Sequence, residues 1–544
     1  MTLDTARITR WIEHDPDATT AAEIQSLLDA GDVEELAKRF AGPLEFGTAG
    51  LRGRCEGGES RMNVATVSRA TAGLAEWLIS RVEHPVVVVG CDARHGSTDF
   101  YQAAAEIFAA AGCTVKLLPP QLPTPFTAYC VRYFDADAGV MVTASHNPPQ
   151  DNGYKVYLAG RVVNSDAEKG VQLISPADKE IAELIAAAPA ADQIPRSREN
   201  IERVGEQVLE EYLARAVSLR RGSSKSDLPI VFTAMHGVGG RILQTVLSHA
   251  GFTQVTAVVE QFDPDPDFPT VDFPNPEEAG ALDLSIASAE AVGAELILAL
   301  DPDADRCSVA IPTDEGWRQL SGDEVGAVLA EDIAREYEGS TGTLAASIVS
   351  SRLLGKIAER HGLKFQPTLT GFKWIARTPE MVMGYEEALG YCTDPEVVRD
   401  KDGITACLRV ADLADRLRAE DKTLQDFLDE IADTYGLYAT APLTFRLSDP
   451  ADIAAALARL QVAPPATLAG AEVTEFADLS EGFRDLASTT GFWLETSAGD
   501  RIVARPSGTE PKLKCYLEVI ASDRTTALER LEQLKQEFAA VLGL

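Results

Sequence analysis

Short apolar runs and amphipathic stretches alternate along most of the chain. Residues 86–91 (Val-Val-Val-Val-Gly-Cys) are typical of a buried strand, 99–112 predict a helix that ends in Gly112, and 113–118 predict a second strand. The same order of strand, helix and strand is predicted twice more, over 229–235, 239–251 and 253–259 and over 343–349, 351–362 and 363–369. Apolar strands that alternate with amphipathic helices indicate βαβ units, in which helices cover pairs of parallel strands.

The C-terminal part of the chain has a different pattern. A strand over 443–447 and a helix over 451–461 precede several strands that run through 515–520, and an amphipathic helix follows over 523–542. Its apolar stripe predicts core packing and consists of Leu528, Leu531, Leu534, Phe538 and Val541. The expected fold is α/β, with three α/β domains and a smaller C-terminal α+β domain. The expected boundaries are 1–205, 206–315, 316–436 and 437–544.

Composition narrows the class of protein. The 544 residues are 45% hydrophobic, as in an ordinary protein with a packed core. No apolar run approaches the roughly 20 residues of a membrane span, and residues 1–40 lack the apolar segment of a signal peptide. The eight cysteines are scattered without a C-x-x-C spacing, which favours reduced thiols over a disulfide framework or a zinc site. We therefore expect a cytoplasmic protein without a membrane partner.

The net charge of −35 argues against nucleic-acid and anionic-membrane partners, because both bind through basic surface. An anionic substrate would need cations that are concentrated locally in a cleft. The basic residues inside Gly- and Pro-marked loops are therefore the informative ones: Arg52, Arg54, Lys155, Arg306, Lys373, Lys401, Arg505, Lys512 and Lys514. Any one of them, taken alone, is most often a solvated surface residue.

The apolar run 139–142 leads into a turn, Thr143-Ala144-Ser145-His146-Asn147-Pro148, that presents a hydroxyl beside an imidazole. A serine at the end of a strand is available as a nucleophile. Taken alone, however, Ser145 is about as often a helix cap or an ordinary turn residue. A second strand-to-loop segment further along the chain, which supplies carboxylates, favours the functional interpretation.

That second segment carries Asp301, Asp303 and Asp305 directly after the apolar run 296–300. Their spacing lets three carboxylates on a curving loop converge on one hard cation, and oxygen-only ligation favours Mg²⁺. A calcium-binding EF-hand begins with the same spacing. It requires glycine at the sixth position and glutamate at the twelfth, and this chain has Arg306 and Pro312 there. A solvated acidic turn is the remaining alternative. Arg306 is placed to hold a phosphate oxygen.

Near the C-terminus, Arg505-Pro506-Ser507-Gly508-Thr509-Glu510-Pro511-Lys512 combines two prolines and a glycine with two hydroxyls and two flanking cations. In a tight loop, backbone N–H groups and hydroxyls of this kind can point inward and bind an anion. The loop therefore suits a phosphate group, and a plain β-turn is the equally good alternative when the segment is considered alone.

Together these segments resemble the α-D-phosphohexomutase superfamily, along nearly the whole chain. Residues 143–148 are similar to its phosphoserine loop, 301–306 to its magnesium loop, 385–390 to its sugar-binding loop and 505–512 to its phosphate-binding loop. Residues 47–53 (Gly-Thr-Ala-Gly-Leu-Arg-Gly) resemble its N-terminal signature. The four loops occur in the family's order, one in each expected domain. The resemblance implies three related α/β domains and a smaller fourth domain around a central cleft.

The resemblance also implies an activity. The enzyme would be an isomerase that interconverts sugar 1-phosphate and sugar 6-phosphate, with Ser145 as the phosphoryl carrier and a bisphosphorylated sugar as intermediate. Arg52 and Arg306 would brace the phosphoserine. Charge on the moving phosphoryl group would be neutralised by one Mg²⁺ per chain. The implied ligands of that ion are Ser145, Asp301, Asp303 and Asp305.

Proton transfer requires a base for the attacking sugar hydroxyl. Lys155 and Lys401 match positions that the family associates with acid–base work. A lysine can accept a proton only if neighbouring cations or burial lower its pKa. The alternative interpretation is that Lys155 and Lys401 bind phosphate oxygens. His146 is expected to act at this site as a hydrogen-bonding partner more than as the base.

Sugar selectivity is expected from Glu386 and from residues 370–373. The implied substrate contacts are Arg306, Thr370, Gly371, Lys373, Glu386, Ala388, Arg505, Ser507, Gly508, Thr509 and Lys512. Ala388 departs from the hexose-specific pattern, in which a serine stands two residues after the glutamate. A related branch with Glu-Glu-Ala in this loop includes phosphoglucomutases that also act as phosphopentomutases. We therefore expect glucose 1-phosphate to be favoured, with mannose and pentose phosphates as alternatives.

Two other classes of protein share parts of this equipment. A phosphoserine-forming phosphatase typically uses two metals with histidine ligands, whereas the seven histidines of this chain show no ligand spacing. A non-catalytic sugar-phosphate sensor would be expected to lose Ser145 or an acidic ligand, and all are present. The mutase is therefore favoured. Its expected partner is a phosphorylated monosaccharide, and the chain is expected to be a monomer or a weak homodimer.

Overall fold

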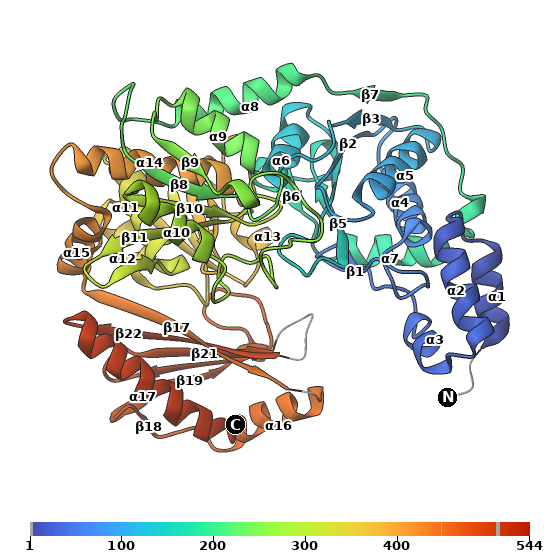
Figure 1. The fold of residues 1–544 in the computed structure, drawn as a ribbon. Coiled ribbons are helices and arrows are strands. Elements are labelled where there is room, and N and C mark those ends of the chain that lie inside the picture. The colour runs from blue at the N-terminus through green and yellow to red at the C-terminus, as the bar shows by residue number, and fades with distance from the viewer. Residues whose placement is uncertain (1–3, 448, 507–511) are drawn as a thin grey trace. The chain divides into compact units, whose positions relative to one another are not determined.

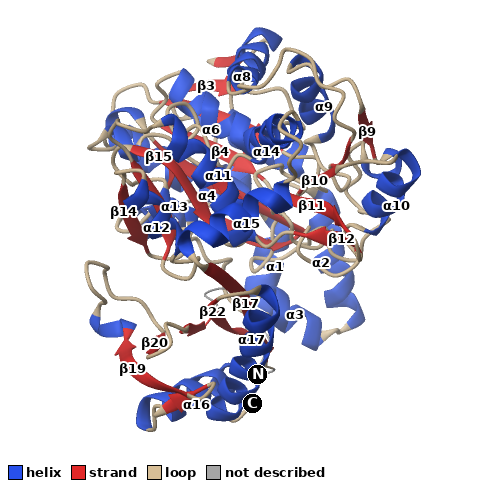
Figure 2. Cartoon of the chain, turned by 90° about the vertical axis from the view of Figure 1, so that its left-hand side faces the viewer, coloured by secondary structure: helices blue, strands red, loops and turns tan. Residues whose placement is uncertain are grey.

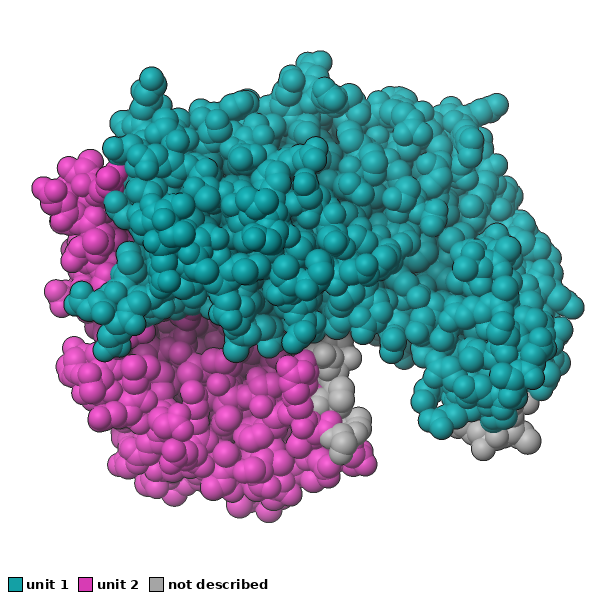
Figure 3. All heavy atoms as spheres, in the orientation of Figure 1, with its two compact units in different colours: residues 1–319, 390–416 teal, residues 320–389, 417–544 magenta. Residues whose placement is uncertain are grey.

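The structure is a computed structural model that describes residues 4–447, 449–506 and 512–544. It divides into two compact units (Figure 3). Unit 1 comprises residues 1–319 and 390–416, and unit 2 comprises residues 320–389 and 417–544. Within the described ranges, no helix is both long and apolar enough to cross a membrane.

Unit 1 begins with three helices that the hydrophobic pattern did not predict: α1 (Thr5–Glu13), α2 (Ala18–Ala30) and α3 (Val33–Arg39). Each helix has an aspartate at its N-cap whose carboxylate accepts a hydrogen bond from a backbone N–H of the first turn. The three helices enclose a small core of their own, built from Ile8, Ile24, Leu36 and Phe40. This acidic segment is therefore folded, and some of its aspartates cap its helices.

The first sheet of unit 1 has the strand order β1-β5-β4-β2-β3-β7, with β6 paired to β5. Its strands are β1 (Leu51–Arg54), β2 (Val86–Cys91), β3 (Thr114–Leu117), β4 (Ala138–Val142), β5 (Asp151–Leu158), β6 (Val171–Gln172) and β7 (Ile201–Arg203). Its helices are α4 (Val64–Ile79), α5 (Ser97–Ala110), α6 (Thr124–Tyr133) and α7 (Ala177–Ala187) (Figure 1). Strand β2 runs parallel to both β3 and β4, so the carboxyl ends of β2 and β4 meet at one edge of the sheet.

The second sheet of unit 1 has the order β12-β11-β10-β8-β9. Its strands are β8 (Ile230–Thr233), β9 (Val255–Ala257), β10 (Leu296–Leu300), β11 (Cys307–Thr313) and β12 (Gly316–Gln319). Strand β8 is parallel to β9 and β10, and β11 turns back antiparallel to β10. The accompanying helices are α8 (Glu206–Ser218), α9 (Gly240–His249) and α10 (Asp283–Val292). After unit 2 has begun, the chain returns to unit 1 with β16 (Gly390–Cys392) and α14 (Gly403–Arg418).

Unit 2 contains the third predicted βαβ unit. Strand β13 (Thr343–Ser347) lies parallel to β14 (Lys364–Thr368) on one side and to β15 (Met381–Glu386) on the other. The helices of this part are α11 (Gly322–Glu336), α12 (Leu353–Arg360), α13 (Phe372–Ile375) and α15 (Leu424–Tyr435). All three predicted βαβ units are confirmed, and their elements differ from the predicted ranges by one or two residues at the ends.

The C-terminal part of unit 2 is an antiparallel sheet of order β17-β22-β21-β20-β19-β18. Its strands are β17 (Leu437–Arg446), β18 (Thr467–Leu468), β19 (Ala471–Asp478), β20 (Phe492–Thr496), β21 (Arg501–Pro506) and β22 (Lys512–Ala521). Helices α16 (Pro450–Val462) and α17 (Arg524–Leu542) share one core with these strands (Figure 2). The predicted α+β character is confirmed. One stripe residue was assigned wrongly, because Leu528 is 53% exposed whereas Leu531, Leu534 and Phe538 are buried.

Candidate active site

Ser145 lies shortly after β4, at the carboxyl edge of the first sheet of unit 1. Its backbone φ is 54°, in the left-handed region that a residue with a Cβ adopts rarely, and the residue is only 3% exposed. The Ser145 N–H donates to Thr143 Oγ1 at 2.9 Å, which closes the turn. The buried, strained turn gives the hydroxyl one defined position, as is common at functional sites.

Arg94 follows β2 at the same edge and fixes this turn through its backbone. The buried guanidinium donates to the carbonyl oxygens of Ser145 (2.6 Å), Asn147 (2.6 Å), Pro148 (2.8 Å) and Asp151 (3.1 Å). One rigid side chain thus satisfies three carbonyl groups of the irregular turn and that of Asp151, the first residue of β5. These four bonds to Arg94 hold the turn through backbone groups and do not involve the Ser145 side chain.

We expect Arg94→Lys to lower the free energy of unfolding by about 1–3 kcal/mol, because an ammonium cannot reach four carbonyl oxygens and leaves some of them unsatisfied. The measurement is urea unfolding of the parent and the variant. Arg54→Lys is the matched control, since the Arg54 side chain is 56% exposed and pairs only loosely with Glu56, at 3.5 Å. Equal stability of the parent and Arg94→Lys would contradict this role.

The three aspartates lie in the turn that follows β10. Asp301, Asp303 and Asp305 are all fully buried, and one ligand oxygen from each lies within 4.8 Å of the others. The Ser145 hydroxyl donates to Asp301 Oδ2 at 2.9 Å. The structure therefore brings together the two segments that the sequence singled out, which are 156 residues apart.

The chemistry of this cluster fits a divalent cation. Among the described residues, no group donates a hydrogen bond to the buried atoms Asp303 Oδ1 and Asp305 Oδ1. Burial, with the charges of Asp303 and Asp305, raises the pKa of Asp301 well above its ordinary value. Buried carboxylate oxygens without donors are costly, and a hard cation with oxygen ligands would compensate them. The three aspartates thus form one oxygen-only cluster that could hold a metal ion.

Lys155, on β5, contacts the same carboxylates. Its Nζ donates to Asp303 Oδ2 at 2.8 Å and to Asp305 Oδ2 at 3.0 Å. Burial alone would lower the pKa of Lys155, but the charges of Asp303 and Asp305 outweigh it and hold the pKa above its ordinary value. A general base would need the opposite shift. In this arrangement Lys155 is an ammonium that ties two metal-site carboxylates together.

Lys401 approaches the cluster from the segment that precedes α14. Its Nζ lies 3.2 Å from Asp305 Oδ2 and 3.6 Å from Asp400 Oδ1. Asp400 is itself held through Oδ2, which accepts hydrogen bonds from Tyr157 Oη at 2.8 Å and from Gln172 Nε2 at 3.0 Å. Lys155 and Lys401, which are far apart in the sequence, therefore both contact the carboxylate cluster.

Three further predicted residues surround Ser145. His146 Nδ1 lies 3.3 Å from Ser145 Oγ, and burial together with the nearby Arg306 and Arg52 holds the pKa of His146 well below its ordinary value. Arg306 Nε is 3.8 Å from both Asp301 Oδ2 and Asp305 Oδ1. Arg52 is exposed on β1 and donates to Asn147 Oδ1 at 3.1 Å. A neutral imidazole suits the predicted hydrogen-bonding role of His146.

The remaining predicted site residues lie in unit 2. Glu386 ends β15, Ala388 follows it, and Thr370, Gly371 and Lys373 lie where β14 leads into α13; all five are partly exposed. The adjacent Glu387 accepts hydrogen bonds from Ser347 and Ser350, and burial raises its pKa to about 7. Arg505 and Lys512 are partly exposed on β21 and β22. The predicted contacts Ser507, Gly508 and Thr509 lie outside the described residues.

Sequence reasoning missed two residues that support this cluster, Arg94 and Thr124. The Thr124 hydroxyl donates to Asp303 Oδ2 at 2.6 Å. A local signal existed for Arg94, because it follows an apolar strand in the same way as Ser145 and Asp301 do. Thr124 stands in a Pro-rich turn, Leu122-Pro123-Thr124-Pro125, that by itself only marks the start of a helix.

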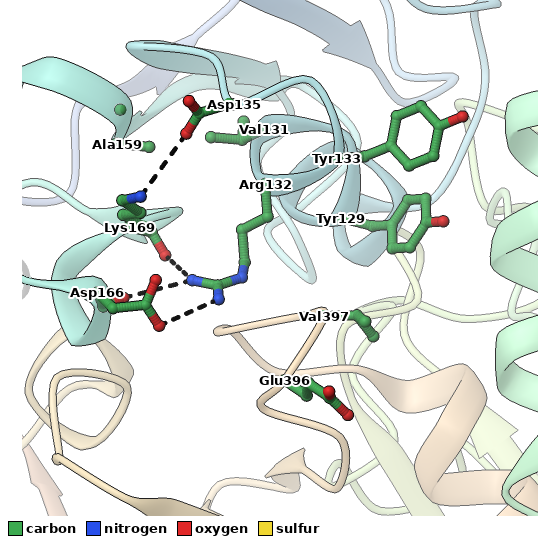
Figure 4. A pocket seen from close by; sticks show the side chains of 11 residues that line it. Tyr129, Val131, Arg132, Tyr133, Asp135, Ala159, Asp166, Lys169, Glu396 and Val397 are labelled. Atoms are coloured by element: carbon green, nitrogen blue, oxygen red, sulfur yellow. Dashed lines mark hydrogen bonds and ion pairs between the residues drawn. The ribbon is translucent and has the colours of Figure 1, made fainter.

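A surface hollow of about 270 Å³ lies elsewhere in unit 1, along the second half of α6 (Figure 4). Its charged side chains pair with one another, Arg132 with Asp166 and Lys169 with Asp135, as the dashed lines show. None of the predicted site residues that the structure describes lines it. The hollow is therefore separate from the Ser145 cluster.

Comparison with known families gives a consistent match. Models of the phosphoglucomutase/phosphomannomutase alpha/beta/alpha domains I, II and III match residues 43–189, 210–316 and 321–435. The phosphoglucomutase named pp63/parafusin from Paramecium, solved in an open form, superposes with a TM-score of 0.71 at 19% identity, over 93% of this chain and 96% of that one. This likeness confirms the fold.

Several curated relatives match the chain nearly from end to end. A Haemophilus influenzae protein named "Probable phosphomannomutase" is 46% identical over 85% of this chain and 94% of its own length. Phosphopentomutase of Mus musculus is 34% identical over 98% of this chain and 93% of its own length. Phosphoglucomutase of Staphylococcus epidermidis is 34% identical over 89% of this chain and 92% of its own length.

The chain therefore belongs to the phosphoglucomutase/phosphomannomutase family, within the α-D-phosphohexomutase superfamily. It is a phosphosugar mutase, an isomerase that works by intramolecular phosphoryl transfer. The predicted class of enzyme is confirmed. The three relatives are named for three different sugars, so the names alone leave the sugar open.

Proposed function

We propose that the enzyme interconverts sugar 1-phosphates and sugar 6-phosphates through a phosphoserine at Ser145 and a bisphosphorylated sugar, with glucose 1-phosphate as the favoured substrate. The observation that carries this proposal is the contact of 2.9 Å between Ser145 Oγ and Asp301 Oδ2, beside two buried carboxylate oxygens without hydrogen bonds. A phosphoryl group on Ser145 would lie directly against the oxygen-only cation site.

The metal site is assigned to Asp301, Asp303, Asp305 and one oxygen on Ser145, with Mg²⁺ as the ion. Bound there, Mg²⁺ would supply neutralisation of the negative charge on the transferring phosphoryl group. Arg52 and Arg306 add positive charge on the solvent side of the turn, where they can contact the remaining phosphoryl oxygens. Rigid support from Arg94 keeps the hydroxyl in line for transfer.

Each half-reaction exchanges one O–P bond for another. The bond from Ser145 Oγ to phosphorus breaks while a sugar hydroxyl forms a bond to the same phosphorus. The proton of that hydroxyl passes to a basic group, and Ser145 Oγ takes up a proton from an acidic group. The second half-reaction reverses these changes at the other end of the sugar. Lys155 and Lys401 are the proposed acid–base pair. With its raised pKa, Lys155 enters as an ammonium, the form that donates a proton or binds a phosphoryl oxygen.

The sugar is proposed to bind through the loop that follows β15. Glu386 accepts hydrogen bonds from ring hydroxyls, and Thr370, Gly371 and Lys373 supply further contacts. The non-reacting phosphate is assigned to the loop from Arg505 to Lys512, including Ser507, Gly508 and Thr509. A sugar bisphosphate would act as both activator and intermediate, because it reloads Ser145 when an intermediate escapes.

A side-by-side assay tests the choice of sugar. We expect the highest kcat/KM with glucose 1-phosphate, and measurable turnover with mannose 1-phosphate or ribose 1-phosphate. All three substrates are assayed with the same enzyme and Mg²⁺ concentration. A kcat/KM for ribose 1-phosphate or mannose 1-phosphate above that for glucose 1-phosphate would overturn the preference while leaving the phosphoryl-transfer proposal intact.

Ala388 is expected to relax the sugar preference, because a serine hydroxyl two residues after Glu386 is missing. One hydrogen bond contributes about 0.5–1.5 kcal/mol net. Ala388→Ser should therefore raise the ratio of kcat/KM for glucose 1-phosphate over ribose 1-phosphate by at most about tenfold, or 1.4 kcal/mol. Ala432→Ser serves as the control, because Ala432 is a partly exposed alanine of the same unit that lies in α15. If the parent already rejects both alternative sugars and Ala388→Ser leaves the ratio unchanged, Ala388 does not determine specificity.

A further inference from the structure

Asp303 is held at two points by Thr124, the first residue of α6. The Thr124 N–H donates to the backbone carbonyl oxygen of Asp303 at 2.9 Å, and the Thr124 hydroxyl donates to Asp303 Oδ2 at 2.6 Å. Both side chains are fully buried. Two bonds from one residue fix both the backbone position and the rotation of the carboxylate.

The two oxygens of this carboxylate have different surroundings. Oδ2 accepts from Thr124 and, at 2.8 Å, from Lys155, whereas Oδ1 is buried and accepts no hydrogen bond from a described residue. Because both donors engage Oδ2, Oδ1 is the oxygen left for a cation, and ligand oxygens of Asp301, Asp303 and Asp305 lie within 4.8 Å of one another. Thr124 is the stiffer of the two donors, because a β-branched residue at the start of a helix has little freedom at χ1 whereas a lysine has four rotatable bonds.

From these contacts we propose that Thr124 is a positioning residue for the metal ion, acting through Asp303. The inference rests on the proposed metal site at Asp301, Asp303 and Asp305. Residues that hold a metal-binding carboxylate in place typically contribute about 10–100-fold to metal affinity. The N-terminal end of α6, with its partial positive charge, also faces the acidic cluster and reduces repulsion among the carboxylates.

A purely structural role for Thr124 predicts a different response to substitution. Thr124→Val keeps the shape and the backbone N–H bond and removes only the hydroxyl. Thr124→Ser keeps the hydroxyl and removes only a methyl group. If Thr124 acted through packing, Thr124→Ser would lose more metal affinity than Thr124→Val. If the hydroxyl positions Asp303, Thr124→Val would lose more.

The test is isothermal titration of the full-length protein with MgCl₂, and separately with MnCl₂. We expect Thr124→Val to bind either ion about 10–100-fold more weakly than the parent, and Thr124→Ser to bind within about threefold of it. Thr127→Val is the matched control, because Thr127 is buried in the same helix and its hydroxyl lies 3.3 Å from Met141 Sδ, away from the carboxylates. It should bind the metal like the parent.

The kinetic counterpart is the Mg²⁺ concentration for half-maximal turnover, which should rise for Thr124→Val and return towards normal for Thr124→Ser. Thr124→Ala is the second variant if the valine side chain prevents folding, as judged by circular dichroism. Unchanged metal affinity in the folded Val or Ala variant, with a parent that binds metal, would overturn the role of Thr124 alone. A parent that binds neither ion would overturn the metal site as well.

Discussion

Replacing Ser145 with alanine will abolish turnover and leave the fold intact. We expect kcat with glucose 1-phosphate to fall by at least about four orders of magnitude, as for other enzymes that lose their nucleophile. The fold should survive, because Arg94 holds the turn through backbone carbonyl oxygens, whereas the Ser145 hydroxyl makes hydrogen-bond contacts with Asp301 and His146 at the cluster. Steady-state kinetics and urea unfolding measure the two effects.

Ser68→Ala is the matched control for this substitution. Ser68 is also buried in unit 1, but its hydroxyl donates to the carbonyl oxygen of Val64 within α4 and accepts from Arg196 at 3.1 Å, apart from the carboxylate cluster. Its loss should leave kcat within about twofold of the parent, since a hydrogen bond of this kind contributes only about 1 kcal/mol to stability. Turnover by Ser145→Ala within severalfold of the parent would remove Ser145 from the mechanism.

Loss of one metal-site carboxylate should be the next most damaging change. Asp303→Asn removes the negative charge and keeps the size, so we expect the Mg²⁺ requirement to rise and kcat to fall by about 10²–10³-fold, or roughly 3–4 kcal/mol of transition-state stabilisation. The same direction is expected for Asp301→Asn and Asp305→Asn. EDTA should inactivate the parent, and added Mg²⁺ should restore it.

Asp415→Asn separates a metal effect from the general cost of changing a largely buried, hydrogen-bonded aspartate, since the Asp415 side chain is 13% exposed. Asp415 accepts hydrogen bonds from Ser226 and Arg220 and lies outside the cluster of three aspartates. It should affect stability and leave the Mg²⁺ dependence of turnover unchanged. Full activity of the parent after EDTA treatment and removal of the chelated metal would show that the carboxylates serve another purpose.

The parts of the site that could be predicted are those with a local signal. Ser145 and Asp301 each follow a short apolar run that is a strand in the structure, β4 and β10, and the spacing of the aspartates by two residues is a pattern in the sequence itself. Strands β4 and β10 belong to two different sheets, and the structure brings the loops after them together, as the contact of 2.9 Å between Ser145 and Asp301 shows. Their role in catalysis stays a prediction.

The parts that could not be predicted depend on contacts between distant segments. Thr124 reaches Asp303 across 179 residues, and Arg94 reaches the Ser145 turn across 51. The pKa of Lys155 depends on burial and on Asp303 and Asp305, and the structure gives a raised value where a base would need a lowered one. Such properties arise only when the chain is folded, because each depends on which groups tertiary packing places together.

The N-terminal helices were missed for a different reason. Helix α2 begins with Ala-Thr-Thr-Ala-Ala-Glu-Ile, in which apolar and polar residues are not clearly separated onto two faces. Ile24 is the one buried residue of this helix. Short helices of this kind are stabilised by capping aspartates and by packing against neighbours, which a search for long apolar stripes does not detect. Leu528 shows the reverse error, since it fits an apolar stripe but lies on the exposed side of α17.

The central claim is that Ser145 carries the phosphoryl group, and intact-mass analysis tests it most directly. The parent, incubated with glucose 1,6-bisphosphate and Mg²⁺ and then desalted, should show a species heavier by about 80 Da, the mass of one phosphoryl group. Ser145→Ala, treated identically, should show none, and Ser68→Ala should match the parent. An active parent that never shows the heavier species, or a Ser145→Ala variant that still does, would contradict the account.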